Sequence, residues 1–586
     1  MHSLLDPPRR ALALRAVACA LPVVAIALTP QIADACGGMF CDAGPSPMPV
    51  DQTGENILFV VDHAAQRVQA HIQIQYTGDA QSFAWVIPVT SIPDRRPGSE
   101  QLFTNLLAAT APSYGLTTTF ECYEYSGGGG GWGCGGDSCC GGETDYAESG
   151  DSDGFMGTGG DTGGVTVLDR DIVGPFYMDI IEADDAAVMM QWLGDNGYQQ
   201  DPDAAPILQE YIDEGHVFVA VKLVNGADVD EILPLVIEYD GVEPCVPLRL
   251  TRIAAIEDMG VRTFFLSEQR AAPTNYKHVL LNPARIDWVS AADNYNEAVT
   301  RAVDEAEGQA FVTEFVGSPS QVSQTGLYSP SWTTLSFAGA ASPIKAGGET
   351  AIDALEEVGL VDCSAGDCVF LHPMIRPILS QFLPAPAGVA EEDFWSDLAA
   401  FADMIDAAAW DGAAMDAMLQ ERIIGPGEEA VTLLKDYATL TRMFTTISPH
   451  EMTVDPTFHF TGDIAQTINQ AKVANQVTAC RGSNRIEFGN PHALLTDESG
   501  LWPELPAAMP WALEVQQIPL AGAPMVLQSN VEIINAKIDE SNERFEFDNG
   551  LSGACSAGQR ANTAWGLSMI GAIFSLAFWT RRRRRG

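Results

Sequence analysis

The stretch VQAHIQIQY, residues 68–76, sets the fold class that we expect for this chain. Every second residue from Val68 onward is apolar, and the residues between them are three glutamines and His71. A period of two is that of a β-strand, in which successive side chains point to opposite faces of a sheet. We therefore predict a half-exposed antiparallel strand with one apolar and one amide-rich face, and we expect His71 to be solvated.

Short β-patterns and single helices alternate downstream of this strand. Gly78 and Asp79 turn the chain, and the apolar run at residues 82–89 predicts a returning strand. Further strands are predicted at residues 165–168, 175–181, 216–224, 232–239, 261–266 and 278–281, and helices at 184–193 and 207–214. Strand pairs mixed with helices in this way indicate an α+β fold and not a doubly wound parallel sheet.

The pattern changes to helix at about residue 291. Apolar residues recur at helical spacing in residues 291–309, 349–358, 391–408 and 428–445, and we assign Phe394 and Trp395 to a core. Candidate strands at 458–460 and 486–488 and one more element at 531–538 follow. The predicted organisation is an antiparallel β-rich unit with a few helices at 36–290, a mainly helical unit at 291–449, and a β-containing region with an acidic linker at 450–549.

The charge of the chain is strongly negative. It has 78 acidic and 31 basic residues, a formal net charge of −47, within 586 residues that are 46% hydrophobic and 8% aromatic. The apolar content predicts packed cores, while the charge repels nucleic acid and anionic lipid. We expect no nucleic-acid partner. The simplest interpretation is that the negative charge keeps the protein soluble, and the alternative is that it binds cations.

The first 35 residues have the parts of a secretory signal peptide. Arg9, Arg10 and Arg15 precede a short apolar stretch at residues 16–28, and small residues that include Ala35 follow. Cleavage after Ala35 leaves Cys36 as the first mature residue, which keeps a lipoprotein alternative open. We therefore expect an exported protein that engages the export machinery.

The last residues, 553–586, predict a tail that tethers the protein to the membrane. Residues 565–579 are apolar and uncharged, and five arginines at 581–585 follow and resist translocation. The tail resembles the myxobacterial-type C-terminal sorting signals, and this resemblance implies a sorting protease as partner and Cys555 as the processing or lipid-attachment position. A plain single-pass transmembrane helix is the alternative, although fifteen residues are short for one. Either arrangement places the protein at the cell surface or outer membrane.

The cysteine pattern predicts disulfide bonds. The chain has 12 cysteines, and three pairs are separated by four residues, a distance that permits small closed loops in an oxidising compartment. The candidates are Cys36 with Cys41, Cys134 with Cys139, and Cys363 with Cys368. Zinc ligation is a weaker interpretation because no C-x-x-C pair occurs.

A glycine-rich and cysteine-rich segment at residues 126–164 interrupts the first unit. Glycine runs without apolar side chains cannot bury enough surface to offset their lost chain entropy, so we predict an exposed loop. Asp151 and Asp153 begin a sequence like that of a calcium loop, but the remaining ligands are missing. Calcium is therefore the one cofactor considered, and none is firmly predicted.

Several short motifs resemble one uncharacterised bacterial family, domain of unknown function 2330. They lie at residues 35–41 (ACGGMFC), 83–89 (FAWVIPV), 211–222, 247–251 (PLRLT), 441–445 (TRMFT) and 452–456 (MTVDP). The resemblance covers about residues 36–460. It implies a shared fold and export, and it implies no activity, catalytic residue or ligand.

The sequence contains no complete catalytic motif. Neither H-E-x-x-H, G-x-S-x-G nor a Walker motif occurs, and the S-x-x-K at Ser342 to Lys345 lacks its partner motifs. His459, near Asp455 and Asp463, is the least implausible metal ligand. We expect a non-enzymatic binding or structural surface protein whose partner is unknown, with an exported hydrolase of distributed active site as the alternative.

Overall fold

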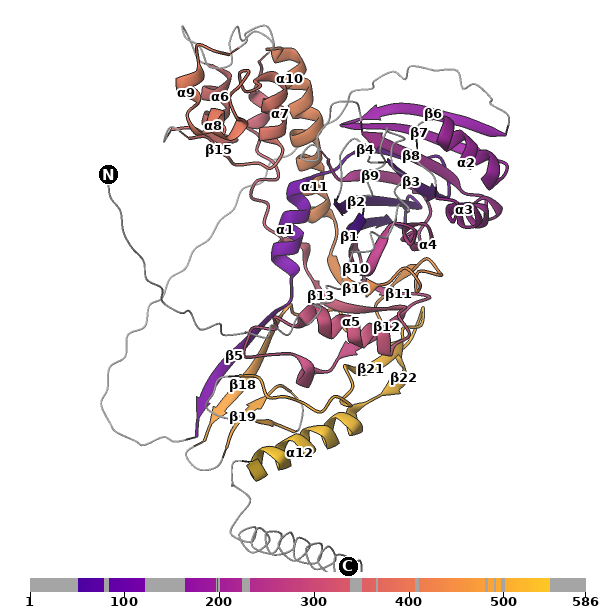
Figure 1. The fold of residues 1–586 in the computed structure, drawn as a ribbon, viewed down its shortest axis with the longest axis vertical. Coiled ribbons are helices and arrows are strands. Elements are labelled where there is room, and N and C mark those ends of the chain that lie inside the picture. The colour runs from indigo at the N-terminus through magenta and orange to yellow at the C-terminus, as the bar shows by residue number, and fades with distance from the viewer. Residues whose placement is uncertain are drawn as a thin grey trace, which may run out of the picture. The chain divides into compact units, whose positions relative to one another are not determined.

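The alternating stretch forms strand β2 of a ten-stranded sheet in this computed structural model (Figure 1). The structure describes residues 51–77, 84–121, 164–196, 198, 201–223, 232–337, 350–364, 367–405, 410–479, 483–489, 492–496 and 501–548. The sheet has the order β22-β21-β12-β13-β16-β10-β1-β2-β9-β4. Its strands are β1 (Asp51–Asp62), β2 (Arg67–Thr77), β4 (Asp94–Pro97), β9 (Leu235–Asp240), β10 (Ala255–Ser267), β12 (Lys277–Leu281), β13 (Ala310–Gly317), β16 (Thr439–Ile447), β21 (Ala512–Gln517) and β22 (Met525–Ser529).

A second, four-stranded antiparallel sheet packs on the apolar face of β2. It consists of β3 (Ala84–Val89), β8 (Val217–Leu223), β7 (Phe176–Ala183) and β6 (Val165–Val173). Phe59 and Ile72 of the large sheet share one core with Ile87 and Val221 of the small sheet. Helices α2 (Ala186–Asp195) and α3 (Ala204–Asp213) cover the other face of the small sheet. The predicted apolar face of β2 is therefore confirmed, and the fold is α+β.

The amide-rich face of β2 is partly covered and His71 is buried, so the prediction of a solvated His71 was wrong. Helices α1 (Glu100–Thr110) and α11 (Gly425–Asp436) pack over this face through a core shared with β1. The His71 side chain is 2% exposed. Its neighbours Gln69 and Gln73 donate to Glu429 and Glu100, each at 2.6 Å. The covering helices come from other parts of the chain, and the strand pattern alone carries no sign of them.

A helical cluster follows β13, as the sequence predicted. It contains α6 (Ala351–Glu357), α7 (Ile375–Phe382), α8 (Glu391–Ser396), α9 (Leu398–Phe401) and α10 (Gly412–Leu419), and Phe394 and Trp395 are buried in its core. The short strands β14 (Val361–Asp362) and β15 (Val369–Phe370) form a hairpin in this cluster. The helix predicted at 428–445 ends at Asp436, because the β-branched residues that follow form the buried strand β16.

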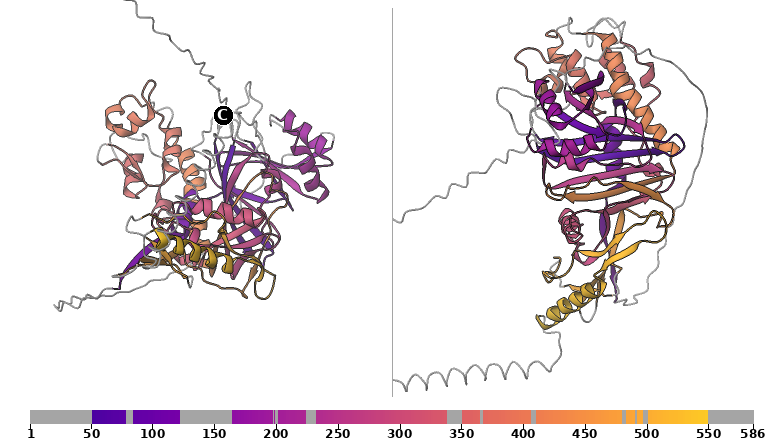
Figure 2. Two further views of the ribbon diagram at one scale, coloured as in Figure 1. Left: turned by 60° about the horizontal axis from the view of Figure 1, so that its bottom comes forward. Right: turned by 90° about the vertical axis from the view of Figure 1, so that its right-hand side faces the viewer.

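A third sheet joins distant segments of the chain. Strand β5 (Ser113–Phe120) pairs in parallel with β18 (Ala471–Thr478), which continues to β19 (Asn484–Glu487) and β20 (Leu494–Thr496). Helix α12 (Val531–Asp548) packs on β20, and Figure 2 shows it beside this sheet. The residues of the predicted acidic linker up to Asp548 are therefore helical. The remaining elements are α4 (Leu248–Thr251), α5 (Tyr295–Glu305), β11 (Arg270–Pro273) and β17 (Phe458–Thr461).

The large sheet draws strands from all three predicted regions of the chain. Its strands β1, β2, β4, β9, β10 and β12 come from the first region, β13 and β16 from the second, and β21 and β22 from the third. The large sheet therefore crosses both predicted boundaries, at residues 290 and 449. Among the described residues, no helix combines the length and apolar character needed to cross a membrane.

Candidate functional site

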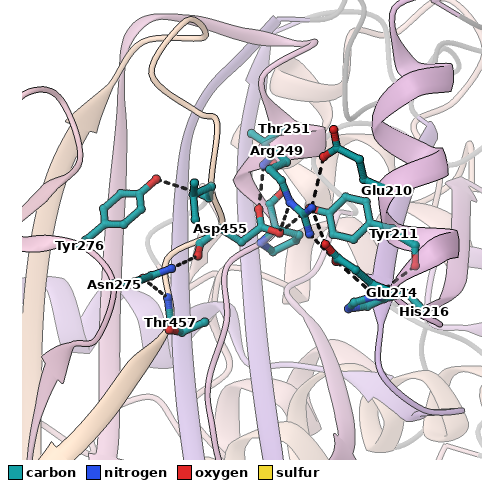
Figure 3. Close-up of polar contacts among 12 residues, drawn as sticks. Glu210, Tyr211, Glu214, His216, Arg249, Thr251, Asn275, Tyr276, Asp455 and Thr457 are labelled. Atoms are coloured by element: carbon teal, nitrogen blue, oxygen red, sulfur yellow. Dashed lines mark hydrogen bonds and ion pairs between the residues drawn. The ribbon is translucent and has the colours of Figure 1, made fainter. Parts of the chain in front are cut away.

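Three of the motif segments meet at one polar cluster (Figure 3). Tyr211 lies on α3, Arg249 on α4, and Asp455 in the connection between β16 and β17. Arg249 and Asp455 are 206 positions apart in the sequence. The folded chain therefore places side chains from three separate motifs within hydrogen-bond distance of one another.

Asp455 is the acceptor at the centre of this cluster. Its Oδ1 accepts a hydrogen bond from the backbone N–H of Arg249 at 2.8 Å. Its Oδ2 accepts from Arg249 Nε at 2.9 Å and from the Tyr211 hydroxyl at 2.7 Å. The residue is 8% exposed, so these bonds replace the water that the carboxylate loses on folding.

Arg249 uses its remaining donors on two more carboxylates. Its NH1 and NH2 groups donate to both oxygens of Glu214 at 2.9 and 2.7 Å, and NH1 reaches Glu210 at 3.3 Å. The guanidinium also lies 4.1 Å from the centre of the Tyr211 ring. Hydrogen bonds from Arg249 lower the pKa of Glu214. Three carboxylates share one guanidinium, so the cluster is a net negative site.

A cavity of about 550 Å³ lies beside this cluster, between the two packed sheets. We call it the inter-sheet cavity. Its walls are apolar side chains from β1, β2, β3 and β9, which the alternating patterns of these strands direct inward. These wall residues include Ile57, Phe59, Ala70, Ile72, Ile87, Val89 and Ile237. Polar residues gather where the walls end, namely Thr90, Tyr211, His216, Asp240, Glu243, Cys245, Asp455 and Thr457.

The comparisons with known proteins identify the family. A family model described as an uncharacterized protein conserved in bacteria (DUF2330) matches residues 30–325. The chain belongs to this family. No curated protein and no solved structure matches it. The family match contains Tyr211 and Arg249 and ends before Asp455, so the cluster joins the matched part of the chain to a segment beyond it.

The described lining of the inter-sheet cavity includes one cysteine, Cys245. Within the described part of the chain it is a free cysteine. Burial raises the pKa of its thiol, and the nearby Asp455 carboxylate raises it further. A nucleophilic cysteine needs the thiolate form, which positive neighbours favour. Burial and the Asp455 carboxylate therefore disfavour the thiolate form of Cys245, although the neighbouring Arg249 acts in the opposite direction.

His459 has hydrogen-bond partners other than the two aspartates near it in sequence. Its Nδ1 lies 3.1 Å from Thr274 Oγ1, and its Nε2 lies 3.1 Å from the carbonyl oxygen of Pro519. Asp463 accepts from the backbone N–H of Gly522. The described residues contain no group of three or more potential ligands that could hold a metal ion. The structure thus places His459 in a strand contact, and Asp455 in the cluster with Arg249.

A threonine hydroxyl lies beside a histidine where β12 and β13 run side by side. Thr313 Oγ1 is 2.9 Å from His278 Nε2, and Arg270 donates to the same Oγ1 at 3.1 Å. Burial lowers the pKa of His278 to about 4. A general base works best with a pKa near the operating pH. This pair is therefore a weak proton-transfer couple at neutral pH, and we assign it to the packing of β12 on β13.

Of the residues predicted from sequence, one cysteine pair lies within the described residues. Cys363 and Cys368 form a disulfide that closes the β14–β15 hairpin, which confirms this pairing. Other predicted positions lie outside the described residues, namely Ala35, Cys36, Cys41, Cys134, Cys139, Cys555, the calcium-like segment at 151–154, the S-x-x-K at 342–345 and both terminal segments.

The sequence contains one local signal for the cluster, which a search for catalytic motifs does not detect. Arg249 stands between Leu248 and Leu250, and both leucines are fully buried. A charged residue within such an apolar run needs a buried partner of opposite charge. That partner, Asp455, is identified only by the tertiary structure.

Proposed function

We propose that this protein is exported and that it binds a small, largely apolar molecule in the inter-sheet cavity without turning it over. The observation that supports binding is an apolar cavity of about 550 Å³ with polar groups gathered at one side. Small-molecule sites in proteins commonly measure about 300–1,000 Å³ and have this lining. Asp240 and Glu243 are exposed at the rim, so the ligand has a neutral or cationic end.

The same geometry disfavours hydrolysis in this cavity. A hydrolase needs an activated nucleophile with a base in hydrogen-bond reach. Burial and the Asp455 carboxylate raise the pKa of the Cys245 thiol, and this carboxylate accepts hydrogen bonds from Arg249 and Tyr211. His216 is directed to the backbone oxygen of Tyr211 at 3.3 Å. Asp455 and His216 thus each have a hydrogen-bond partner other than the Cys245 thiol.

The proposed location is the outside of the cell, with the C-terminal tail as tether. The signal-like residues 1–35 and the apolar tail with its arginines support this location. The Cys363–Cys368 disulfide also supports it, because such bonds persist in oxidising compartments. The tail would be recognised by a sorting protease, with Cys555 as the processing or lipid-attachment position.

A photoreactive alcohol tests the binding proposal on the full chain. The full-length protein in phosphatidylcholine nanodiscs is irradiated with a diazirine derivative of dodecanol, and the labelled peptides are identified by mass spectrometry. We expect label on peptides of β1, β3 and β9. Ala70→Phe fills the cavity, since Ala70 lines its wall and is 4% exposed, and should remove this label.

Two controls make the outcome decisive. Val526→Phe adds the same ring on the exposed strand β22, where Val526 is 51% exposed, and should leave the label unchanged. Val89→Phe fills the cavity from another strand, in case Ala70→Phe impairs folding. Thermal unfolding shows which variants are folded. Undiminished cavity label in a folded, cavity-filled variant would refute the proposal.

A further inference from the structure

Two adjoining cavities lie on the part of the large sheet that carries β12, β13 and β21. The larger measures about 680 Å³ and lies among these strands, β5, β18 and the start of α5. The smaller measures about 150 Å³ and adjoins it, since Pro112, Tyr114, Tyr295 and Glu314 line both. We call the two together the α5 cavity. It shares no described lining residue with the inter-sheet cavity.

The larger part of the α5 cavity is apolar and aromatic. Ile286, Trp288, Phe488 and Leu513 contribute to its walls. The Tyr114 ring lies 5.0 Å from the Trp288 ring, edge to face. This part therefore suits the apolar body of a ligand.

A buried ion pair lies where the two parts join. Strand β13 has a bulge at Glu314, because Thr313 pairs with Met443 and Phe315 pairs with the next residue along, Arg442. A bulge re-aims the extra residue, and here Glu314 lines both parts of the cavity. Arg442 donates to Glu314, and both side chains are almost fully buried, at 5% and 1% exposed. The Tyr295 hydroxyl donates to the same carboxylate at 2.7 Å.

Two further basic side chains line the α5 cavity and are not part of this ion pair. Arg262 lines the smaller part and lies 4.5 Å from the centre of the Phe444 ring, and Lys472 lines the larger part. Within the described part of the chain, neither side chain makes an ion pair or hydrogen bond. Lys472 is the register partner of Tyr114 on the neighbouring parallel strand, so both side chains lie on one face.

Unpaired cations are unexpected in this protein. The chain has 78 acidic residues for 31 basic ones, so carboxylates are abundant as partners. Glu314 is the one acidic residue among the described lining residues, against Arg262, Arg442 and Lys472. Burial also lowers the pKa of Arg262 and of Lys472, and the neighbouring Arg442 lowers that of Arg262 further.

We propose that the α5 cavity binds an amphiphilic carboxylate. The carboxylate pairs with Arg262 and Lys472, and the aliphatic body lies against Trp288 and Phe488. The ligand charge completes a site that is net positive in an acidic protein. This ligand differs in charge from the neutral or cationic one proposed for the inter-sheet cavity.

The test uses a diazirine derivative of dodecanoic acid on the full chain in phosphatidylcholine nanodiscs. We expect label on peptides of β12, α5 and β18. Dodecanol should compete at least about tenfold more weakly than dodecanoate, because it cannot form the charge-assisted bonds. Dodecyl phosphate competing as well as dodecanoate would show that a single anionic head is recognised and support the site. Equal competition by dodecanol would overturn it.

Variants separate a binding role from a structural one. Arg262→Gln combined with Lys472→Gln should reduce acid labelling about tenfold and leave dodecanol labelling of the inter-sheet cavity unchanged. Lys472→Arg keeps the charge and should keep the label. Lys435→Gln, at an exposed position on α11, is the matched control. Full acid labelling in the double variant would overturn the proposal. If the double variant fails to fold, each single Gln variant is measured, and undiminished label in both would overturn it equally.

Discussion

Asp455 links three other parts of the chain, two through its carboxylate and one through its backbone oxygen. It accepts from Arg249 and Tyr211, and its backbone oxygen accepts from Asn275 at 2.7 Å. Loss of one partner of a buried ion pair leaves the other partner uncompensated. Loss of the Asp455 carboxylate should therefore destabilise the protein much more than loss of Glu210 or Glu214, the more exposed partners of Arg249.

Asp455→Asn is expected to lower the free energy of unfolding by about 3 kcal/mol, because Arg249 loses its buried countercharge. Glu210→Gln is the matched control, since Glu210 pairs with the same Arg249 but its side chain is 60% exposed. Its effect should stay below about 1 kcal/mol. Urea unfolding followed by circular dichroism measures both, and equal effects would contradict the assignment of Asp455 as the centre of the cluster.

Glu55 makes stability depend on pH at the residue scale. It lies on the same face of β1 as Ile57, and burial raises its pKa from the ordinary 4.5 to about 7. The folded state therefore favours the protonated form. Its contribution is fully present below pH 4.5 and is lost as the pH rises to about 7, an effect of about 3 kcal/mol.

Glu55→Gln should remove this loss. The gain in unfolding free energy of the variant over the unaltered protein should therefore be larger at pH 8 than at pH 4.5. Unfolding free energies of the variant and the unaltered protein are compared at both values. Only this difference isolates Glu55, because burial lowers the pKa of His71 to about 3 and acts in the opposite direction in the same range. Parallel pH profiles would show that Glu55 is not the group responsible.

At the scale of elements, α11 is fixed against its neighbours by a glycine. A Cβ at Gly427 would lie 1.8 Å from the carbonyl oxygen of Leu327. The first turn of α11 can therefore lie this close to the backbone of Leu327 only because position 427 has no side chain. This close approach helps to hold α11 over the partly covered amide-rich face of β2.

Gly427→Ala should destabilise the protein by about 2 kcal/mol, although alanine usually stabilises a helix relative to glycine. The sign of the effect is the test, and thermal unfolding measures it. Ala413→Gly on the exposed side of α10 is a control that should cost about 1 kcal/mol through helix propensity alone. A stabilising Gly427→Ala would mean that the backbone contact is absent.

At the scale of the whole molecule, the proposed export predicts two properties of intact cells. A membrane-impermeant biotin reagent should label the protein, and a maleimide should react with Cys363 and Cys368 only after reduction. The double substitution Cys363→Ser and Cys368→Ser is the control, whose maleimide reaction at these positions is lost with and without reductant. A protein found unlabelled, with both thiols free, would refute the proposed location.

Substitutions of Cys36 and Cys555 are expected to affect delivery to the cell surface differently. Cys555→Ser should reduce surface labelling severalfold, because the resemblance of the tail to sorting signals implies that Cys555 is the processing or lipid-attachment position. Cys36→Ser should leave surface labelling unchanged if cleavage after Ala35 is that of an ordinary signal peptide. Surface biotinylation of both variants measures this. The reverse result would favour the lipoprotein alternative at Cys36.

The sequence by itself determined the α+β class, the apolar face of β2, about half of the described strand positions, the helical cluster around Phe394 and Trp395, and the Cys363–Cys368 pairing. These features depend on local periodicity or short spacing, which the linear chain contains. The helix predicted through residue 445 failed at β16, because burial on both faces makes a strand continuously apolar or β-branched, and such a pattern resembles a helix.

Only the tertiary structure decided which residues meet. His71 is buried because helices from distant segments cover its face, and Asp455 reaches Arg249 across 206 positions. The excess cations of the α5 cavity likewise come from β10 and β18, which no motif connects. Such contacts depend on the closure of long loops around shared cores, and a single sequence carries no local signal of where that closure occurs.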